Sequence, residues 1–274
     1  MKRPKNRGVA VNPKRYNGWL AAFRNYRVPV NQELIQHWLS QFDDAHRDIA
    51  ARVLDSVLFL DQAHIETSFR TMLSSLEGWH RFKTRRQGRW YFVPFSRSAG
   101  ESGDSMTHAF RRANGLSTRH FDELFIQRSE LPLLKLGPDD HVVLIDDFSG
   151  TGDQACKSWA DPFEELLASG PKVYLMIVAA TRAAQKQIKD KTEMELVCGQ
   201  ILKSSAHLFS ADCDYFESAE KTAILSYCLK ADPNKPKGYG ECGLAVVLAH
   251  QSPNNSIPIL TTSSDDWDPL FPRS

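Results

Sequence analysis

The stretch HVVLIDDFSGTGDQA, residues 141–155, combines in a few residues the patterns that decide the fold class. Its apolar run, 142–145, predicts a buried strand, and the adjacent carboxylates of Asp146 and Asp147 follow at once. The small residues 149–152 then predict a tight loop that leads into a helix beginning near Asp153 or Gln154. A buried strand, a glycine-containing loop and a helix in direct succession are typical of a βαβ unit with a parallel sheet.

The polar part of this stretch has the chemistry of a ribose 5-phosphate site. In parallel sheets ligands bind outside the carboxyl ends of the strands, where both acids and the loop are expected. Carboxylates can accept hydrogen bonds from ribose hydroxyls, which predicts that role for Asp146 and Asp147. Glycines, hydroxyls and the first N–H groups of a helix suit a phosphate. The residues predicted to bind it are Ser149, Gly150, Thr151, Gly152, Asp153 and Gln154.

Composition limits the function classes. The chain has 274 residues, of which 42% are hydrophobic, so it can bury a full core. Its net charge of +1 creates no overall field that would attract nucleic acid or an anionic membrane. No apolar run approaches the roughly 18 residues of a membrane span, and residues 1–15 lack the apolar core of a secretory signal. We therefore expect a cytoplasmic protein without a membrane partner.

Cysteine and histidine spacing gives no metal or disulfide signal. The five cysteines include no CxxC pair, and the histidines form no HExxH motif. We expect reduced thiols and no metal ion held by protein ligands alone.

The apolar spacing changes near residue 90. Residues 31–78 show helical spacing and predict three amphipathic helices, with Asn31 and Asp61 as N-caps. We expect these helices to pack against a following sheet domain, because their apolar stripes would otherwise stay wet. The predicted organisation is an N-terminal helical region, 1–84, and an α/β domain, 85–274.

Short apolar runs after residue 90 predict the strands of the α/β domain. Near-continuous runs of this kind indicate a parallel sheet covered on both faces by helices. The predicted strands are 90–95, 124–127, 142–145, 173–179, 196–202, 244–249 and 257–260.

The acidic pair and the loop also resemble a known family. Asp146, Asp147, Thr151 and Gly152 match the positions of the phosphoribosyl-diphosphate (PRPP) motif of type I phosphoribosyltransferases. The stretch DDFSGTG and the helical N-terminal region are more similar to the phosphoribosyltransferase-like proteins of bacterial conflict and anti-phage systems, including some retron-associated effectors, than to nucleotide-salvage enzymes. Asp153 stands where a small residue is common, so its carboxylate is expected to point away from the phosphate or to cap the helix.

The resemblance implies further roles. It implies a phosphoribosyltransferase-like fold and transfer of a phosphoribosyl group to an unknown acceptor, with Asp146 and Asp147 as the catalytic pair. In the resembled fold the loop after the first core strand receives the pyrophosphate, which assigns this role to Arg97 and Ser98. Arg128 is in a place where the family often has a basic pyrophosphate contact. Mg²⁺ would be bound through the PRPP diphosphate.

Two other functions remain open at this point. The chain could be a non-catalytic module that senses PRPP or a nucleotide. It could also be an interaction protein held by a partner protein or ribonucleoprotein of a defence complex. The basic residues between the two predicted regions are compatible with nucleic-acid binding, but charge runs are more often solvated linkers; they are Arg81, Lys83, Arg85, Arg86 and Arg89.

Overall fold

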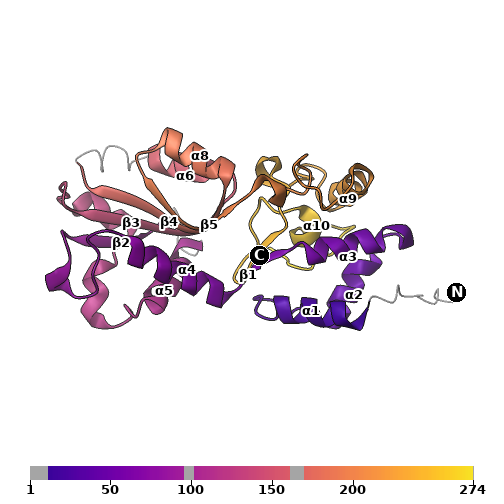
Figure 1. The fold of residues 1–274 in the computed structure, drawn as a ribbon, viewed down its shortest axis with the longest axis horizontal. Coiled ribbons are helices and arrows are strands. Elements are labelled where there is room, and N and C mark those ends of the chain that lie inside the picture. Colours follow the sequence, from indigo (N-terminus) through magenta and orange to yellow (C-terminus); the bar gives the residue numbers. More distant parts are fainter. Residues whose placement is uncertain (1–11, 96–101, 161–169, 274) are drawn as a thin grey trace. The chain divides into compact units, whose positions relative to one another are not determined.

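The computed structural model describes residues 12–95, 102–160 and 170–273 (Figure 1). The chain forms two compact units, which are described separately below. One unit combines Met1–Gln62 with Ser204–Ser274, and the other is Ala63–Lys203. This grouping divides the chain after residues 62 and 203, whereas the sequence predicted a single boundary after residue 84.

The unit Ala63–Lys203 is built on a four-stranded parallel sheet. Its strands are β2 (Trp90–Pro94), β3 (His141–Ser149), β4 (Lys172–Thr181) and β5 (Glu195–Leu202), in the spatial order β2-β3-β4-β5. Strands β3 and β4 are buried along most of their length, as their continuous apolar runs predicted. The predicted α/β class with a parallel sheet flanked by helices is therefore confirmed.

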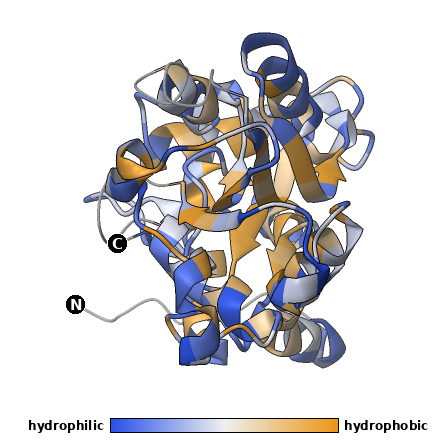
Figure 2. Cartoon of the chain, turned by 90° about the vertical axis from the view of Figure 1, so that its left-hand side faces the viewer, coloured by the Kyte–Doolittle hydropathy of each residue, from blue (hydrophilic) through white to orange (hydrophobic). Residues whose placement is uncertain are grey.

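Helices cover both faces of this sheet. Helices α6 (Asp153–Ser158) and α8 (Arg182–Lys191) lie on one face, and α4 (Gln62–Ser75) and α5 (Ser102–Ala113) lie on the other (Figure 1). On the second face Phe110 of α5 packs against Phe69 of α4 and Phe92 of β2, with ring centroids 5.6 and 4.7 Å apart. Figure 2 shows the hydrophobic residues concentrated on the strands.

The other unit joins the two ends of the chain. Its helices are α1 (Pro13–Phe23), α2 (Gln32–Ser40), α3 (Arg47–Asp55), α9 (Ser218–Ala231) and α10 (Pro258–Thr261). Its strands β1 (Leu58–Leu60) and β6 (Val246–Leu248) pair in parallel, with Leu58 opposite Val246. The helices share one apolar core with residues 204–274, and the indole Nε1–H of Trp38 donates to the carbonyl of Ile259 at 2.7 Å.

Short 3-10 helices connect these elements. They are Asp44–His46, Lys83–Arg85, Arg119–Leu124, Arg128–Leu133, Ser204–Ala206 and Tyr239–Glu241. Among the described residues, no helix is both long enough and apolar enough to cross a membrane.

Several predicted elements are confirmed and others are wrong. Of the three helices predicted in 31–78, all form, and Asn31 caps α2 by accepting a hydrogen bond from the Leu34 N–H at 2.9 Å. The predicted strand 124–127 does not form, and Phe125 makes only an isolated bridge to Phe92. The predicted strand 257–260 is instead helix α10, because Pro258 at its start cannot donate to a sheet and has a φ suited to a first helical turn.

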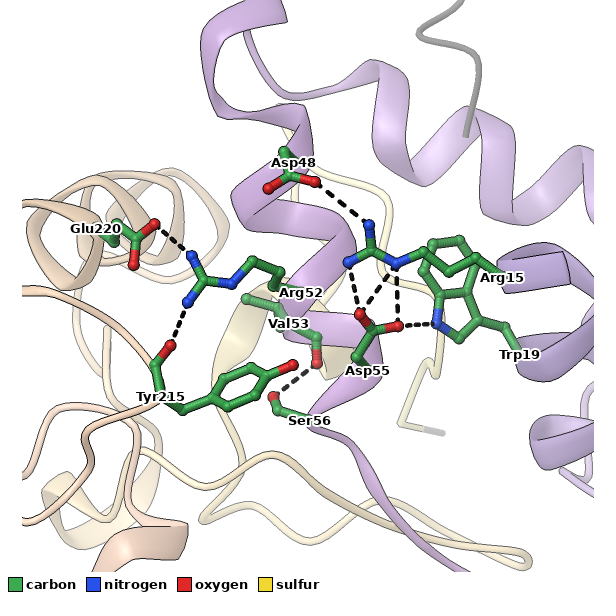
Figure 3. Close-up of polar contacts among 9 residues, drawn as sticks. All are labelled: Arg15, Trp19, Asp48, Arg52, Val53, Asp55, Ser56, Tyr215 and Glu220. Atoms are coloured by element: carbon green, nitrogen blue, oxygen red, sulfur yellow. Dashed lines mark hydrogen bonds and ion pairs between the residues drawn. The ribbon is translucent and has the colours of Figure 1, made fainter. Parts of the chain in front are cut away.

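A polar network connects helices of the unit that combines Met1–Gln62 with Ser204–Ser274 (Figure 3). The guanidinium of Arg15 on α1 binds the carboxylate of Asp55 on α3, with Nη2 2.5 Å from Oδ2. The same carboxylate accepts from the Trp19 indole Nε1–H at 2.8 Å. Nearby, Arg52 of α3 donates to the Glu220 carboxylate on α9 and to the backbone carbonyl of Tyr215.

Replacing Asp55 by alanine is expected to destabilise this unit by about 1–3 kcal/mol, because the buried Trp19 N–H loses its acceptor and the Arg15 guanidinium loses the closer of its two carboxylates. Urea denaturation would measure the loss. Asp48→Ala is the matched control, since the Asp48 side chain is 76% exposed and contacts only the edge of the same guanidinium. It should cost below about 0.5 kcal/mol. Equal losses for the two variants would contradict the role given to Asp55.

Candidate functional site

The acidic pair lies on strand β3 itself. The sequence predicted a strand ending at residue 145, but β3 continues to Ser149, which pairs with Ala180 of β4. Strand β2 accompanies β3 only to the level of Ile145, whose carbonyl accepts from the Phe95 N–H at 3.0 Å. Asp146 and Asp147 therefore occupy the carboxyl-terminal part of β3, past its ladder with β2.

Backbone groups orient both carboxylates. The Asp147 N–H donates to Oδ1 of Asp146 at 2.9 Å, and the Phe148 N–H donates to Oδ1 of Asp147 at 2.6 Å. Asp146 is 6% exposed, and Asp147 is half-buried. The two adjacent carboxylates are thus held in defined orientations at the end of the central sheet, where they can accept hydrogen bonds from a ligand.

The loop after β3 depends on glycine at position 152. Gly152 has a φ of 86°, in the left-handed region, and caps the start of α6. A Cβ atom at this position would lie 3.1 Å from the Ala184 carbonyl oxygen and 3.2 Å from Cβ of Gln187. From the sequence, we explained the need for glycine at this position by a close approach of the backbone to a phosphate. In the structure the space beside its Cα is filled by α8, so glycine is required for packing and backbone conformation.

Helix α8 and its N-cap residue Thr181 hold the loop in place through hydrogen bonds. The Thr181 hydroxyl, which is fully buried, donates to the Gly150 carbonyl at 2.5 Å and accepts from the Ala184 N–H at 3.0 Å. The Gln187 amide donates to the Asp153 carboxylate at 2.8 Å. Two side chains of one neighbouring segment thereby fix both ends of the loop.

These contacts also explain the unusual Asp153. Its carboxylate is hydrogen-bonded to Gln187, and its backbone N–H donates to the Thr151 hydroxyl at 3.2 Å. Helix α6 begins at Asp153, as predicted. An acidic residue is accommodated here because α8 supplies a donor for it.

Three residues that support the loop were missed by the sequence analysis: Thr181, Ala184 and Gln187. Thr181 directly precedes a helical pattern, so the N-cap preference for threonine could have indicated its capping role. Its second bond, to Gly150, carries no sequence signal. Gln187 has none either, because its partner Asp153 is distant in the chain and the two positions share no periodic pattern.

Arg128 links the end of β2 to the end of α6. One terminal amino group of its guanidinium donates to the Phe95 carbonyl at 3.2 Å, and the other donates to the Ser158 carbonyl at 3.1 Å. The strand predicted directly before it, 124–127, does not form, and Arg128 begins a 3-10 helix. Arg97 and Ser98 lie outside the described residues. Arg128 is therefore placed beside Phe95, directly before the segment that contains them.

Burial disfavours the thiolate form of Cys156, the cysteine closest to the loop along the chain. Burial raises the pKa of Cys156 on α6, although a hydrogen bond to the Gln187 carbonyl, 3.7 Å from Sγ, acts in the opposite direction. Cys156 is therefore a protonated thiol at neutral pH. The described site can orient a ligand through carboxylates, hydroxyls and backbone groups.

Comparisons with known structures give distant similarities. The chain is similar to orotate phosphoribosyltransferase of Mycobacterium tuberculosis H37Rv in complex with inorganic phosphate, with 15% identity over 59% of this chain and 79% of that one, at a TM-score of 0.31. Protein AQ2163 of Aquifex aeolicus shows 18% identity over 64% and 87% of the two chains, at a TM-score of 0.34. TT1426 of Thermus thermophilus shows 16% identity over 45% and 57%, at a TM-score of 0.22. A search of curated proteins found no match.

The family comparison covers far more of the chain. The family described as PRTase-CE matches residues 35–273, which include most of both compact units and the whole β3 motif. The parallel sheet, with its acidic pair and glycine loop at the carboxyl end of a central strand, lies within this match. The chain therefore belongs to the PRTase-CE family.

Proposed function

We propose that this protein binds PRPP, or a related ribose-phosphate nucleotide, at the carboxyl end of β3 and transfers the phosphoribosyl group to an acceptor. The observation that carries this proposal is the pairing of two oriented carboxylates with a loop that α8 fixes from behind. In this arrangement the loop is preorganised, so a ligand does not have to order it on binding.

The two parts of the motif have separate roles in the proposal. Asp146 and Asp147 accept hydrogen bonds from the ribose hydroxyls. The loop from Ser149 to Gln154 binds the 5-phosphate through hydroxyls and backbone N–H groups. Since charge-assisted hydrogen bonds are stronger than neutral ones, both parts contribute to affinity.

The proposed reaction exchanges one bond for another at C1 of the ribose. The C1–O bond to pyrophosphate breaks, and the leaving pyrophosphate keeps the bonding electron pair. An acceptor nitrogen or other nucleophile supplies the electron pair of the new bond to C1. Positive charge develops on the ribose in between, so the protein mainly has to fix the sugar and stabilise the leaving pyrophosphate. The negatively charged carboxylates next to the ribose also stabilise the developing positive charge.

Mg²⁺ is part of the proposed substrate complex. It prefers oxygen ligands and usually binds through substrate phosphates with one or two carboxylates. The donors at the end of β3 fit this preference, because Asp146 and Asp147 supply carboxylate oxygens. When bound through the diphosphate, Mg²⁺ neutralises charge on the leaving group.

Arg97→Ala tests the pyrophosphate part of the site. If Arg97 binds the diphosphate, its loss should weaken PRPP binding about tenfold or more but leave ribose 5-phosphate binding nearly unchanged, because only PRPP carries a diphosphate. Calorimetric titration in the presence of Mg²⁺ would compare the two ligands. Equal losses for both would remove Arg97 from the site.

Pyrophosphate release separates transfer from binding alone. The protein would be incubated with PRPP, Mg²⁺ and a panel of nitrogen-containing acceptors. Acceptor-dependent release would establish turnover, whereas tight PRPP binding with no release would favour the regulatory module. A role as an effector in bacterial anti-phage defence is also part of the proposal, and it predicts that cells lose phage protection when the wild-type protein is replaced by Asp147→Asn.

A further inference from the structure

A polar cavity lies entirely within the unit formed by the two ends of the chain. Its volume is about 530 Å³, which is within the range of roughly 300–1,000 Å³ that is usual for small-molecule sites. Its polar lining includes Lys235, Asn254, Thr261, Thr262, Ser263 and Arg273. None of these residues belongs to the β3 motif, so the cavity is separate from the proposed phosphoribosyl site.

One wall of the cavity is a tightly ordered turn. Oδ1 of Asp232 accepts hydrogen bonds from the backbone N–H groups of Asn234 and Lys235, at 2.9 and 3.0 Å. The Lys235 ammonium lies 5.8 Å from the centre of the Tyr239 ring. The turn thus holds a lysine at the cavity, and Asp232, the one carboxylate among the described lining residues, is already engaged by two N–H donors.

Close backbone contacts fix the next part of the wall. Gly238 has a φ of 75°, and a Cβ atom there would lie 2.6 Å from the Ser256 carbonyl oxygen. The Tyr239 N–H donates to the Asn254 carbonyl at 2.7 Å. The two loops that meet at the cavity are therefore packed backbone against backbone, which limits how far the cavity can collapse.

Helix α10 and the chain after it complete the wall. The Arg273 N–H donates to the Thr261 carbonyl at 3.0 Å, and the Phe271 N–H donates to the Leu260 carbonyl at 2.8 Å. These bonds bring Arg273 to the same cavity as Lys235. Two cationic side chains from distant parts of the chain are thus placed around one polar space.

Several residues that carry hydroxyl groups line the cavity. Thr261, Thr262 and Ser263 all line the cavity, and Thr261 is 2% exposed as a whole residue. Thr262 is half-buried and Ser263 is exposed, so both are accessible from the cavity. By contrast, the Ser256 hydroxyl donates to the Val246 carbonyl at 2.6 Å.

We propose that this cavity binds a phosphorylated sugar. Lysine and arginine together with several hydroxyl donors suit a phosphate group. The cavity is larger than a bare phosphate needs, and most of its remaining lining is polar, which suits the hydroxyls of a sugar better than a flat apolar ring. This site is independent of the proposed phosphoribosyl chemistry.

Glucose 6-phosphate is the probe, and glucose is its uncharged counterpart. Calorimetric titration of the full chain should show binding of the phosphate ester and none of glucose. The double variant Lys235→Ala/Arg273→Ala should lose affinity roughly tenfold or more, because both charge-assisted contacts are removed. Thr262→Val, which keeps both charges, should weaken binding by a smaller factor.

Two controls assign the binding to this cavity. Lys237 is on the same loop as Lys235, but its ammonium pairs with the Glu241 carboxylate at 3.1 Å and it does not line the cavity. The variant Lys237→Ala should therefore bind glucose 6-phosphate like the parent. Asp147→Asn should also bind like the parent. The proposal is overturned if the parent fails to bind below about 10 mM, if folded double variant and Thr262→Val both bind as tightly as the parent, or if Asp147→Asn abolishes binding.

Discussion

Replacement of Gly152 by valine is expected to abolish PRPP binding while the sheet stays folded. Valine would have to adopt a φ of 86°, and its Cβ would press against the Ala184 carbonyl. The loop can relieve this strain only by moving away from α8, which would break the Thr181–Gly150 and Gln187–Asp153 hydrogen bonds. We also expect a lower Tm, because the strained backbone costs about 1–3 kcal/mol.

Calorimetric titration with PRPP and Mg²⁺, together with circular dichroism, would measure both effects. Gly137→Val is the matched control in the same unit. A Cβ at Gly137 has its nearest neighbour at 3.9 Å, on Asp140, and the residue does not need the left-handed region. This variant should bind PRPP like the parent. Unchanged binding by folded Gly152→Val would show that the loop does not contact the ligand.

Asp147→Asn is expected to lower the affinity for PRPP about tenfold or more. The substitution keeps the size of the side chain but replaces a charged acceptor by a neutral amide, and hydrogen bonds to charged groups are worth roughly 1.5–3 kcal/mol. The loss should also appear with ribose 5-phosphate, because both ligands carry the ribose hydroxyls. The Tm should stay near that of the parent, since the half-buried Asp147 is outside the apolar core.

Asp139→Asn provides the control for this change of charge. Asp139 is exposed in the turn before β3, at the opposite end of the strand from the proposed site. Its replacement should leave PRPP affinity unchanged. If folded Asp147→Asn and Gly152→Val both bind PRPP as tightly as the parent, residues 146–154 form only a turn and the proposed phosphoribosyl function is wrong.

Local patterns predicted the centre of the sheet well. Strands β3 and β4 are buried on both faces, so their apolar runs are nearly continuous and identify them without any knowledge of their neighbours. The start of α6 at Asp153 was also predicted, because small residues and a glycine mark the preceding turn. Only the end of β3 was misjudged, since Asp146 and Asp147 are polar residues that continue a strand.

Short apolar runs outside this centre were ambiguous. Residues 257–260 are as apolar as a strand, but Pro258 favours the first turn of a helix, and α10 forms there. Strand β1 was not predicted, because Leu58–Leu60 lie within residues 31–78, whose apolar spacing is helical. It forms because β6, from the far end of the chain, provides its hydrogen-bonding partner.

The sequence by itself determined the strand, the acidic pair, the glycine loop and the helix that follows, because each depends on neighbouring residues and on backbone preferences that a short stretch encodes. Only the tertiary structure decided what supports them. The hydroxyl of Thr181 reaches Gly150, and the amide of Gln187 reaches Asp153, across a wide separation in the chain. Such contacts depend on how β4 and α8 return to the end of β3, and a pairing between distant side chains leaves no periodic pattern in a single sequence.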